Sequence, residues 1–211
     1  MAGPAMNGIT ASTALWYASR ATGVVALVLL TAVVALGVLV NRQGRLPGLP
    51  RFAVTGLHRN ISLLAVAFLA VHIAAAIADP YVSIRAVAAL IPFTSSYEPF
   101  WLGLGAIAID LIVALVATSL VRARIGRRAW RAVHWLAYAT WPVALAHSLG
   151  ASTDARHGVL LDLAIGCALA VAAAAAWRVL GRAAQTPVAH RPAAVLAGRP
   201  DDRNRMRAGA R

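Results

Sequence analysis

Four histidines stand inside strongly apolar stretches of the chain, where a polar side chain needs a reason to be present. His58 and His72 are 14 residues apart in LHRNISLLAVAFLAVH, and His134 and His147 are 13 residues apart in WRAVHWLAYATWPVALAH. Imidazole is a common metal ligand, and a low-spin haem iron takes two such nitrogens from opposite faces of the porphyrin. The residue types therefore indicate ligation of a metal or a haem, or hydrogen bonds between helices.

The elements that carry these histidines are long apolar runs. The chain has 211 residues, of which 60% are hydrophobic and 13% charged, and a membrane-spanning helix needs about 20 mostly apolar residues. Runs rich in Ala, Leu and Val, separated by Gly, Pro and Arg clusters, predict helices and not a barrel. We expect an all-α integral membrane bundle of about five transmembrane helices, over about residues 14–40, 57–78, 100–121, 130–149 and 158–180.

The arginines predict the orientation of this bundle. The net charge is +13, and all twenty basic residues are arginines, most of which follow the first, third and fifth runs. Because cytoplasmic loops carry an excess of basic residues, we expect the N-terminus outside and the C-terminus in the cytoplasm. The basic C-terminal tail has no interleaved aromatic residues, so we expect membrane lipid and not nucleic acid beside it.

This pattern predicts that the chain has three parts. Residues 1–13 are expected to form a short outside segment, and residues 14–180 a single membrane domain. Residues 181–211 are rich in Arg, Ala, Pro, Asp and Gly, a composition that cannot bury a core. We expect them to be a disordered basic cytoplasmic tail.

In this orientation both histidine-bearing helices run outward, so the histidines pair by depth. His58 and His134 fall at the inner level and His72 and His147 at the outer level, about 20 Å apart at a rise of about 1.5 Å per residue. A Zn or Cu site needs three or four ligands at one point, which this separation forbids for all four. The pattern favours two bis-histidine haems. They would be noncovalent haem b, because Cys167 is the only cysteine.

The two spacings differ in how well they fit a straight helix. Fourteen residues rotate by about 1400°, within about 40° of a whole number of turns, so His58 and His72 share a face. Thirteen residues leave His134 and His147 about 140° apart. We therefore expect a kink or overwinding between them, which Pro142 can provide.

Other polar residues in the runs have expected roles. Arg20, near the outer end of the first run, is expected to bind a propionate of the outer haem. Arg59 and Arg131 are candidates for the same role at the inner haem, or they extend toward lipid headgroups. Asp110 and Asp162 fall within predicted spans, where a buried carboxyl would be neutral or partnered, as an acceptor for a ligand histidine or as a proton relay.

The histidine-bearing stretches resemble the ferric reductase-like transmembrane superfamily, which includes ferric reductases and NADPH oxidases. Together with WYASRATGVVAL in the first run, they are similar to its small bacterial stand-alone members, such as the haem-binding membrane subunit of methionine sulfoxide reductase systems. The resemblance covers about residues 14–180 and implies a bacterial plasma membrane. Larger members usually have an extra first helix and a C-terminal flavin and nicotinamide module, which these 211 residues do not carry.

The resemblance also implies a function. We expect a membrane cytochrome b that takes electrons from a cytoplasmic flavin-dependent partner and passes them through two haems. The outside acceptor would be a ferric chelate, dioxygen or a periplasmic reductase, and whether the chain is itself an enzyme stays open. The alternative is a haem-free structural or transport subunit that uses the histidines for proton relay or helix packing.

Overall fold

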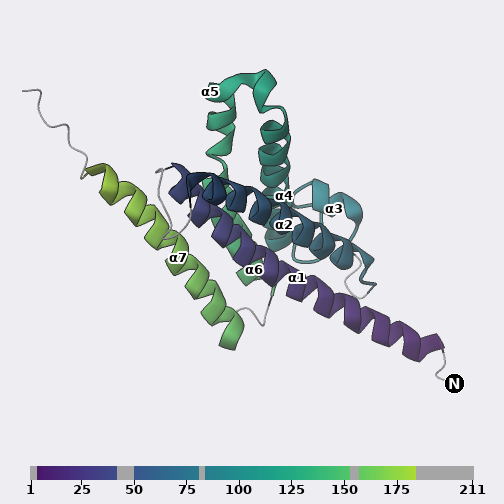
Figure 1. Cartoon of the computed structure of the whole chain (residues 1–211). Coiled ribbons are helices and arrows are strands. Elements are labelled where there is room, and N and C mark those ends of the chain that lie inside the picture. The colour runs from purple at the N-terminus through teal and green to yellow at the C-terminus, as the bar shows by residue number, and fades with distance from the viewer. Residues whose placement is uncertain (1–3, 42–49, 81–83, 153–156, 184–211) are drawn as a thin grey trace, which may run out of the picture. The chain divides into compact units, whose positions relative to one another are not determined.

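A computed structural model describes residues 4–41, 50–80, 84–152 and 157–183 of the chain (Figure 1). All the elements in these ranges are helices, and none is a strand. They are α1 (Pro4–Asn41), α2 (Arg51–Ala78), α3 (Ala86–Leu90), α4 (Pro99–Leu120), α5 (Arg122–His134), α6 (Ala137–Ala151) and α7 (Gly158–Ala183). The all-α prediction is therefore confirmed.

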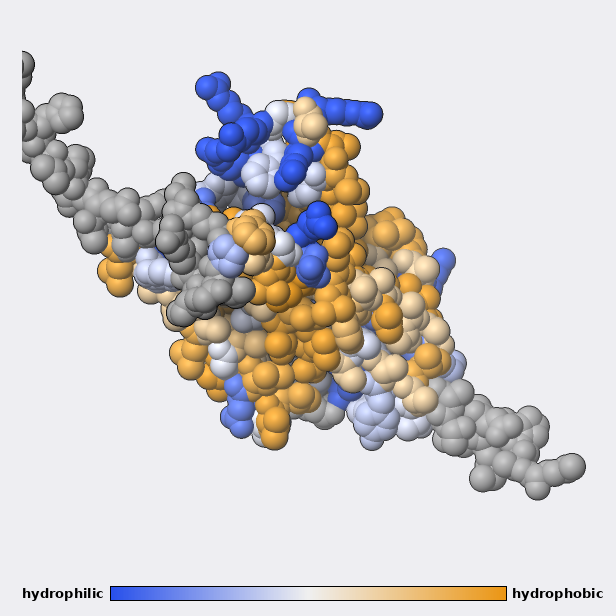
Figure 2. Space-filling view, in the orientation of Figure 1, coloured by the Kyte–Doolittle hydropathy of each residue, from blue (hydrophilic) through white to orange (hydrophobic). Residues whose placement is uncertain are grey.

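Four of the described helices are long and apolar enough to cross a bilayer. These candidate spans are Ser12–Asn41, Phe52–Ala78, Pro99–Leu120 and Gly158–Leu180. Large apolar side chains point outward from them, such as Leu63, Val113 and Leu169, each about 60% exposed, and Figure 2 shows a broad apolar surface. Such a surface is stable only against lipid. The chain is thus a multi-pass membrane protein with a helical bundle.

The fifth predicted span, residues 130–149, differs from the expectation. It is divided at Trp135 and Leu136 into the end of α5 and all of α6, and neither α5 nor α6 alone meets the length of a span. At the division the backbone N–H groups of Leu136, Tyr138 and Ala139 donate to carbonyls three residues earlier, at 2.9–3.1 Å. This is 3₁₀ geometry, which advances about 120° per residue instead of about 100°.

The overwinding reduces the rotational mismatch between the two histidines that flank it. Three residues of 3₁₀ geometry recover about 60° of the mismatch of about 140° between His134 and His147. The distortion lies upstream of Pro142, which sits inside α6. A proline ring clashes with the carbonyl four residues before it. Here that carbonyl belongs to Tyr138, directly after the division.

Helix α5, in the basic segment, is interrupted at one residue. Gly126 interrupts this helix with φ of 78° and ψ of 159°, a region that glycine adopts without steric cost. No residue of α5 is buried. The segment that precedes α4, expected to be a connection, contains the short helix α3, which packs against α4.

The helices pack in two groups, one of α1 and α2 and the other of α3, α4, α5 and α6. The two groups contact each other through α1 and α6. Helix α1 lies along α2 and also contacts α6, while α4 packs against α3, α5 and α6. Between α1 and α6, the indole N–H of Trp141 donates to Oγ1 of Thr31 at 2.9 Å, and the Thr31 hydroxyl donates to the carbonyl of Leu27. Trp141 also forms a buried cluster with Val34 and with Cys167 of α7. This layer joins both groups at mid-height.

The contacts divide the chain into Met1–Ala176 and Trp177–Arg211. The first unit contains the bundle just described. Of the second, the structure describes only the end of α7, so residues 184–211 of the predicted tail lie outside the described residues. At the other end, α1 begins at Pro4, within the segment expected to precede the first helix.

The Trp141–Thr31 hydrogen bond is expected to stabilise the bundle measurably. Trp141→Phe keeps an aromatic ring but removes the N–H donor, and should lower the free energy of unfolding by about 0.6–1 kcal/mol. Thr31→Val should cost a similar amount, and the double variant little more than either. Unfolding in detergent micelles measures this, with the lipid-facing Leu169→Ala as control. Losses that simply add would contradict the assigned bond.

Candidate functional site

The rings of His72 and His147 face each other across the bundle from α2 and α6. Their centres are 6.4 Å apart and their planes are inclined at 75°. Nδ1 of His72 lies 2.7 Å from the carbonyl oxygen of Ser19, and Nδ1 of His147 lies 2.8 Å from that of Trp101. Because a carbonyl can only accept, both Nδ1 atoms carry the proton. Each Nε2 is therefore left with a free lone pair, the state that binds a metal.

This separation fits two imidazoles that share one metal atom. A metal–imidazole bond is roughly 2.0–2.1 Å long, and a ring nitrogen lies roughly 1.2 Å from the centre of its ring, so two such rings have centres roughly 6.5 Å apart. The observed 6.4 Å agrees with that value. Helices α2 and α6 are not among the closely packed pairs of the described helices, so the rings approach each other while their backbones stay apart.

His58 and His134 form a second pair, which is held differently. The two side chains are close enough to interact electrostatically, and the carbonyl of Val33 lies near the His58 ring. Neither Nδ1 meets the geometry of a hydrogen bond within the described part of the chain, although both atoms are buried. The His134 ring instead stacks on Trp130, with centres 4.9 Å apart and planes within 25°. Trp130 donates its indole N–H to Oγ of Ser119 at 3.3 Å.

The structure thus brings the four predicted histidines together as two pairs. Within the described ranges, no three His, Cys, Asp or Glu side chains gather at one point. The donor set at each location is therefore two imidazoles. Two trans nitrogen ligands suit a low-spin haem iron, whereas a closed Zn site takes four ligands. The donor set and the ring separation at His72 and His147 fit a bis-histidine haem, and His58 and His134 provide the same two donors.

Of the five other polar residues with predicted roles, four are exposed and one is half-buried. Arg20 is half-buried next to Ser19 in the sequence, and its guanidinium carbon lies 4.1 Å from the centre of the Trp16 ring. Arg59 and Arg131 are exposed, as are Asp110 and Asp162. Because these two carboxyls lie outside the packed interior, the structure does not place either against a ligand histidine.

Sequence reasoning missed a buried carboxyl and a set of glycines. Asp79, at the end of α2, is 4% exposed and accepts a hydrogen bond from Oγ of Ser12 at 3.0 Å, which ties α1 to α2. Gly23, Gly37 and Gly105 lie directly against histidine rings. A signal was present in the sequence, since Gly23 and Gly37 are 14 residues apart, the same spacing as His58 and His72.

Comparison with known proteins identifies the family of the chain. Searches of curated proteins and of solved structures give no match. The model of one family, described as ferric reductase like transmembrane component, matches residues 22–145, which is more than half of the chain and includes three of the four paired histidines. The expected resemblance is therefore confirmed, and the chain belongs to the ferric reductase-like transmembrane family.

Proposed function

We propose that the chain is a membrane b-type cytochrome that carries electrons across the bilayer through two haems. One would be held by His72 and His147, and the other by His58 and His134. The observation that carries the proposal is the facing pair of rings 6.4 Å apart, each with its Nδ1 proton directed at a carbonyl. Membership in a family of membrane electron-transfer components supports it. The bound haem supplies one-electron chemistry at its iron.

The protein's own residues would position and insulate the two sites. Along α2, His58 and His72 are separated by about 20 Å at the helical rise. Val34, Trp141 and Cys167 form a buried cluster at mid-height, which would lie between the two haem levels. Carbonyl partners raise the basicity of a ligand histidine and fix its orientation, a role that Ser19 and Trp101 would have for one pair.

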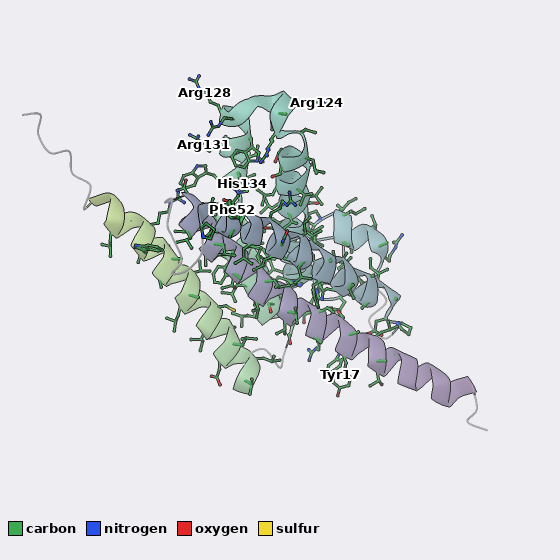
Figure 3. All side chains as sticks on the ribbon, viewed as in Figure 1. Tyr17, Phe52, Arg124, Arg128, Arg131 and His134 are labelled. Carbon is green, nitrogen blue, oxygen red and sulfur yellow. The ribbon has the colours of Figure 1, made fainter. Side chains whose placement is uncertain are left out.

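The proposed partners follow from charge. Figure 3 shows Arg124, Arg128 and Arg131 directed away from α5, which ends at His134. The five arginines of α5 are all exposed. We infer that an acidic, flavin-dependent donor approaches this cytoplasmic side of a bacterial cell membrane. The acceptor on the other side would be a ferric chelate, dioxygen or a periplasmic reductase, with Arg20 beside that haem.

Haem content tests the proposal most directly. The purified chain should carry two haems and show a reducible low-spin spectrum. His72→Ala and His58→Ala should each remove one haem and leave the other, because each removes one of the two histidines that would hold that haem. The exposed His157→Ala is the matched control and should keep both. A folded protein without any chromophore would instead support the haem-free structural or transport function.

The charge of α5 should control reduction by a protein donor. Replacing Arg124, Arg127 and Arg128 by Gln should slow reduction by flavodoxin, an acidic flavoprotein, about tenfold at low salt and less at high salt, because electrostatic steering is screened. Reduction by dithionite, which needs no docking, should not change. Stopped-flow absorbance of the haem measures both, with Arg85→Gln as the control. Equal flavodoxin rates in the triple variant and the parent protein would refute the assigned docking surface.

A further inference from the structure

Three of the four paired histidines rest on a glycine of the neighbouring helix. A Cβ atom on Gly23 would lie 2.9 Å from both Cε1 and Nδ1 of His72, and one on Gly105 would lie 2.8 Å from the same two atoms of His147. A Cβ on Gly37 would lie 3.4 Å from Cε1 of His58. Any other residue at Gly23 or Gly105 would therefore displace the ring that lies there.

The carbonyl nearest each ring belongs to the residue four positions before the glycine. His72 contacts Gly23 and donates to Ser19, and His147 contacts Gly105 and donates to Trp101. His58 contacts Gly37 and lies near the Val33 carbonyl. In an α-helix, the carbonyl of residue i−4 accepts the N–H of residue i. It has a second lone pair, which a side chain at position i would otherwise cover.

We propose that Gly23 and Gly105 are positioning residues that, with the carbonyls of Ser19 and Trp101, form seats for the two ligand histidines. Each glycine lets an imidazole approach the helix backbone closely enough to share a carbonyl already used within the helix. The shared carbonyl holds the proton on Nδ1 and directs Nε2 toward the facing ring. This inference rests on the proposed function only in naming haem as the ligand of Nε2.

The two histidine pairs differ in how closely the neighbouring helices hold their rings. Both members of the His72/His147 pair have a glycine contact and a short hydrogen bond. In the other pair, His58 has the looser contact with Gly37, and His134 has a stacked tryptophan in place of a glycine. The His72/His147 pair is therefore set before a ligand binds, whereas in the other pair His58 has only the nearby Val33 carbonyl and neither Nδ1 meets the geometry of a hydrogen bond in the described structure.

Other glycines of the bundle show that a histidine seat is not a general packing feature. Gly103 and Gly150 lie against Phe93 and Trp101, so they make room for larger aromatic rings. A Cβ atom added to Gly56 or Gly166 would meet nothing within 4 Å. These last two provide matched controls on the same kind of helix.

The test replaces the glycines one at a time by alanine in the full chain. Gly23→Ala and Gly105→Ala should speed haem loss from the His72/His147 site to apomyoglobin about 10–100-fold, the usual effect of disturbing a group that orients a ligand histidine. Each should also shift the ferric electron paramagnetic resonance signal of that site, which depends on imidazole orientation. Gly37→Ala should have a smaller effect, confined to the other site. Gly56→Ala and Gly166→Ala should match the parent protein.

A second measurement needs neither a variant nor a bound haem. In the parent chain, ¹⁵N-histidine magnetic resonance should show the proton of His72 and His147 on Nδ1. The opposite tautomer, or alanine variants at Gly23 and Gly105 that keep the parent spectrum and haem-loss rate, would overturn the seats. If the chain binds no haem, the proposed function fails while the tautomer still decides whether the seats exist.

Discussion

The structure depends on the close contact between an imidazole ring and the backbone of the neighbouring helix. His72 and His147 reach backbone carbonyls at 2.7 and 2.8 Å, which requires that nothing larger than hydrogen projects from Gly23 and Gly105. In a bilayer, a histidine has no water to satisfy its second nitrogen. A helix carbonyl is an acceptor that every transmembrane helix already contains. The contact therefore satisfies a polar atom and orients the imidazole ring at the same time.

Because of this contact, two helices carry the histidines and two others provide the backbone that the rings contact. Helices α2 and α6 carry His72 and His147, while α1 and α4 present the glycines and carbonyls that hold them. The packing agrees with this division, because α1 lies along α2 and α4 lies against α6. Each histidine-bearing helix thus packs against a helix that contacts its histidine, so α2 and α6 need not pack on each other. The two rings can therefore face each other with their centres 6.4 Å apart.

A hydrogen bond between α6 and α1 sets how the two groups of helices meet. The Trp141 indole donates to Thr31, which lies on α1 between Gly23 and Gly37. This hydrogen bond fixes the height of α6 relative to α1, and hence the height of His147 relative to His72. The overwound turn at Trp135 and Leu136 then brings His134 toward the face of α6 that carries His147. In the second pair, near the exposed arginines of α5, His134 stacks on Trp130, while His58 lies against Gly37 and near the carbonyl of Val33.

Sequence patterns alone were enough to predict the class of protein, the long apolar helices, the family and the partition of the four histidines into two pairs. These follow from hydropathy, helical rise and residue spacing, which are local properties of the chain. The packing of the helices was needed to show where the fourth predicted helix divides, that Asp110 and Asp162 are exposed, and that Gly23, Gly37 and Gly105 contact the rings. These features depend on which helix lies beside which, at what height and rotation. A glycine in an apolar run has the same local preferences whether it faces lipid or a histidine, so no local rule distinguishes them.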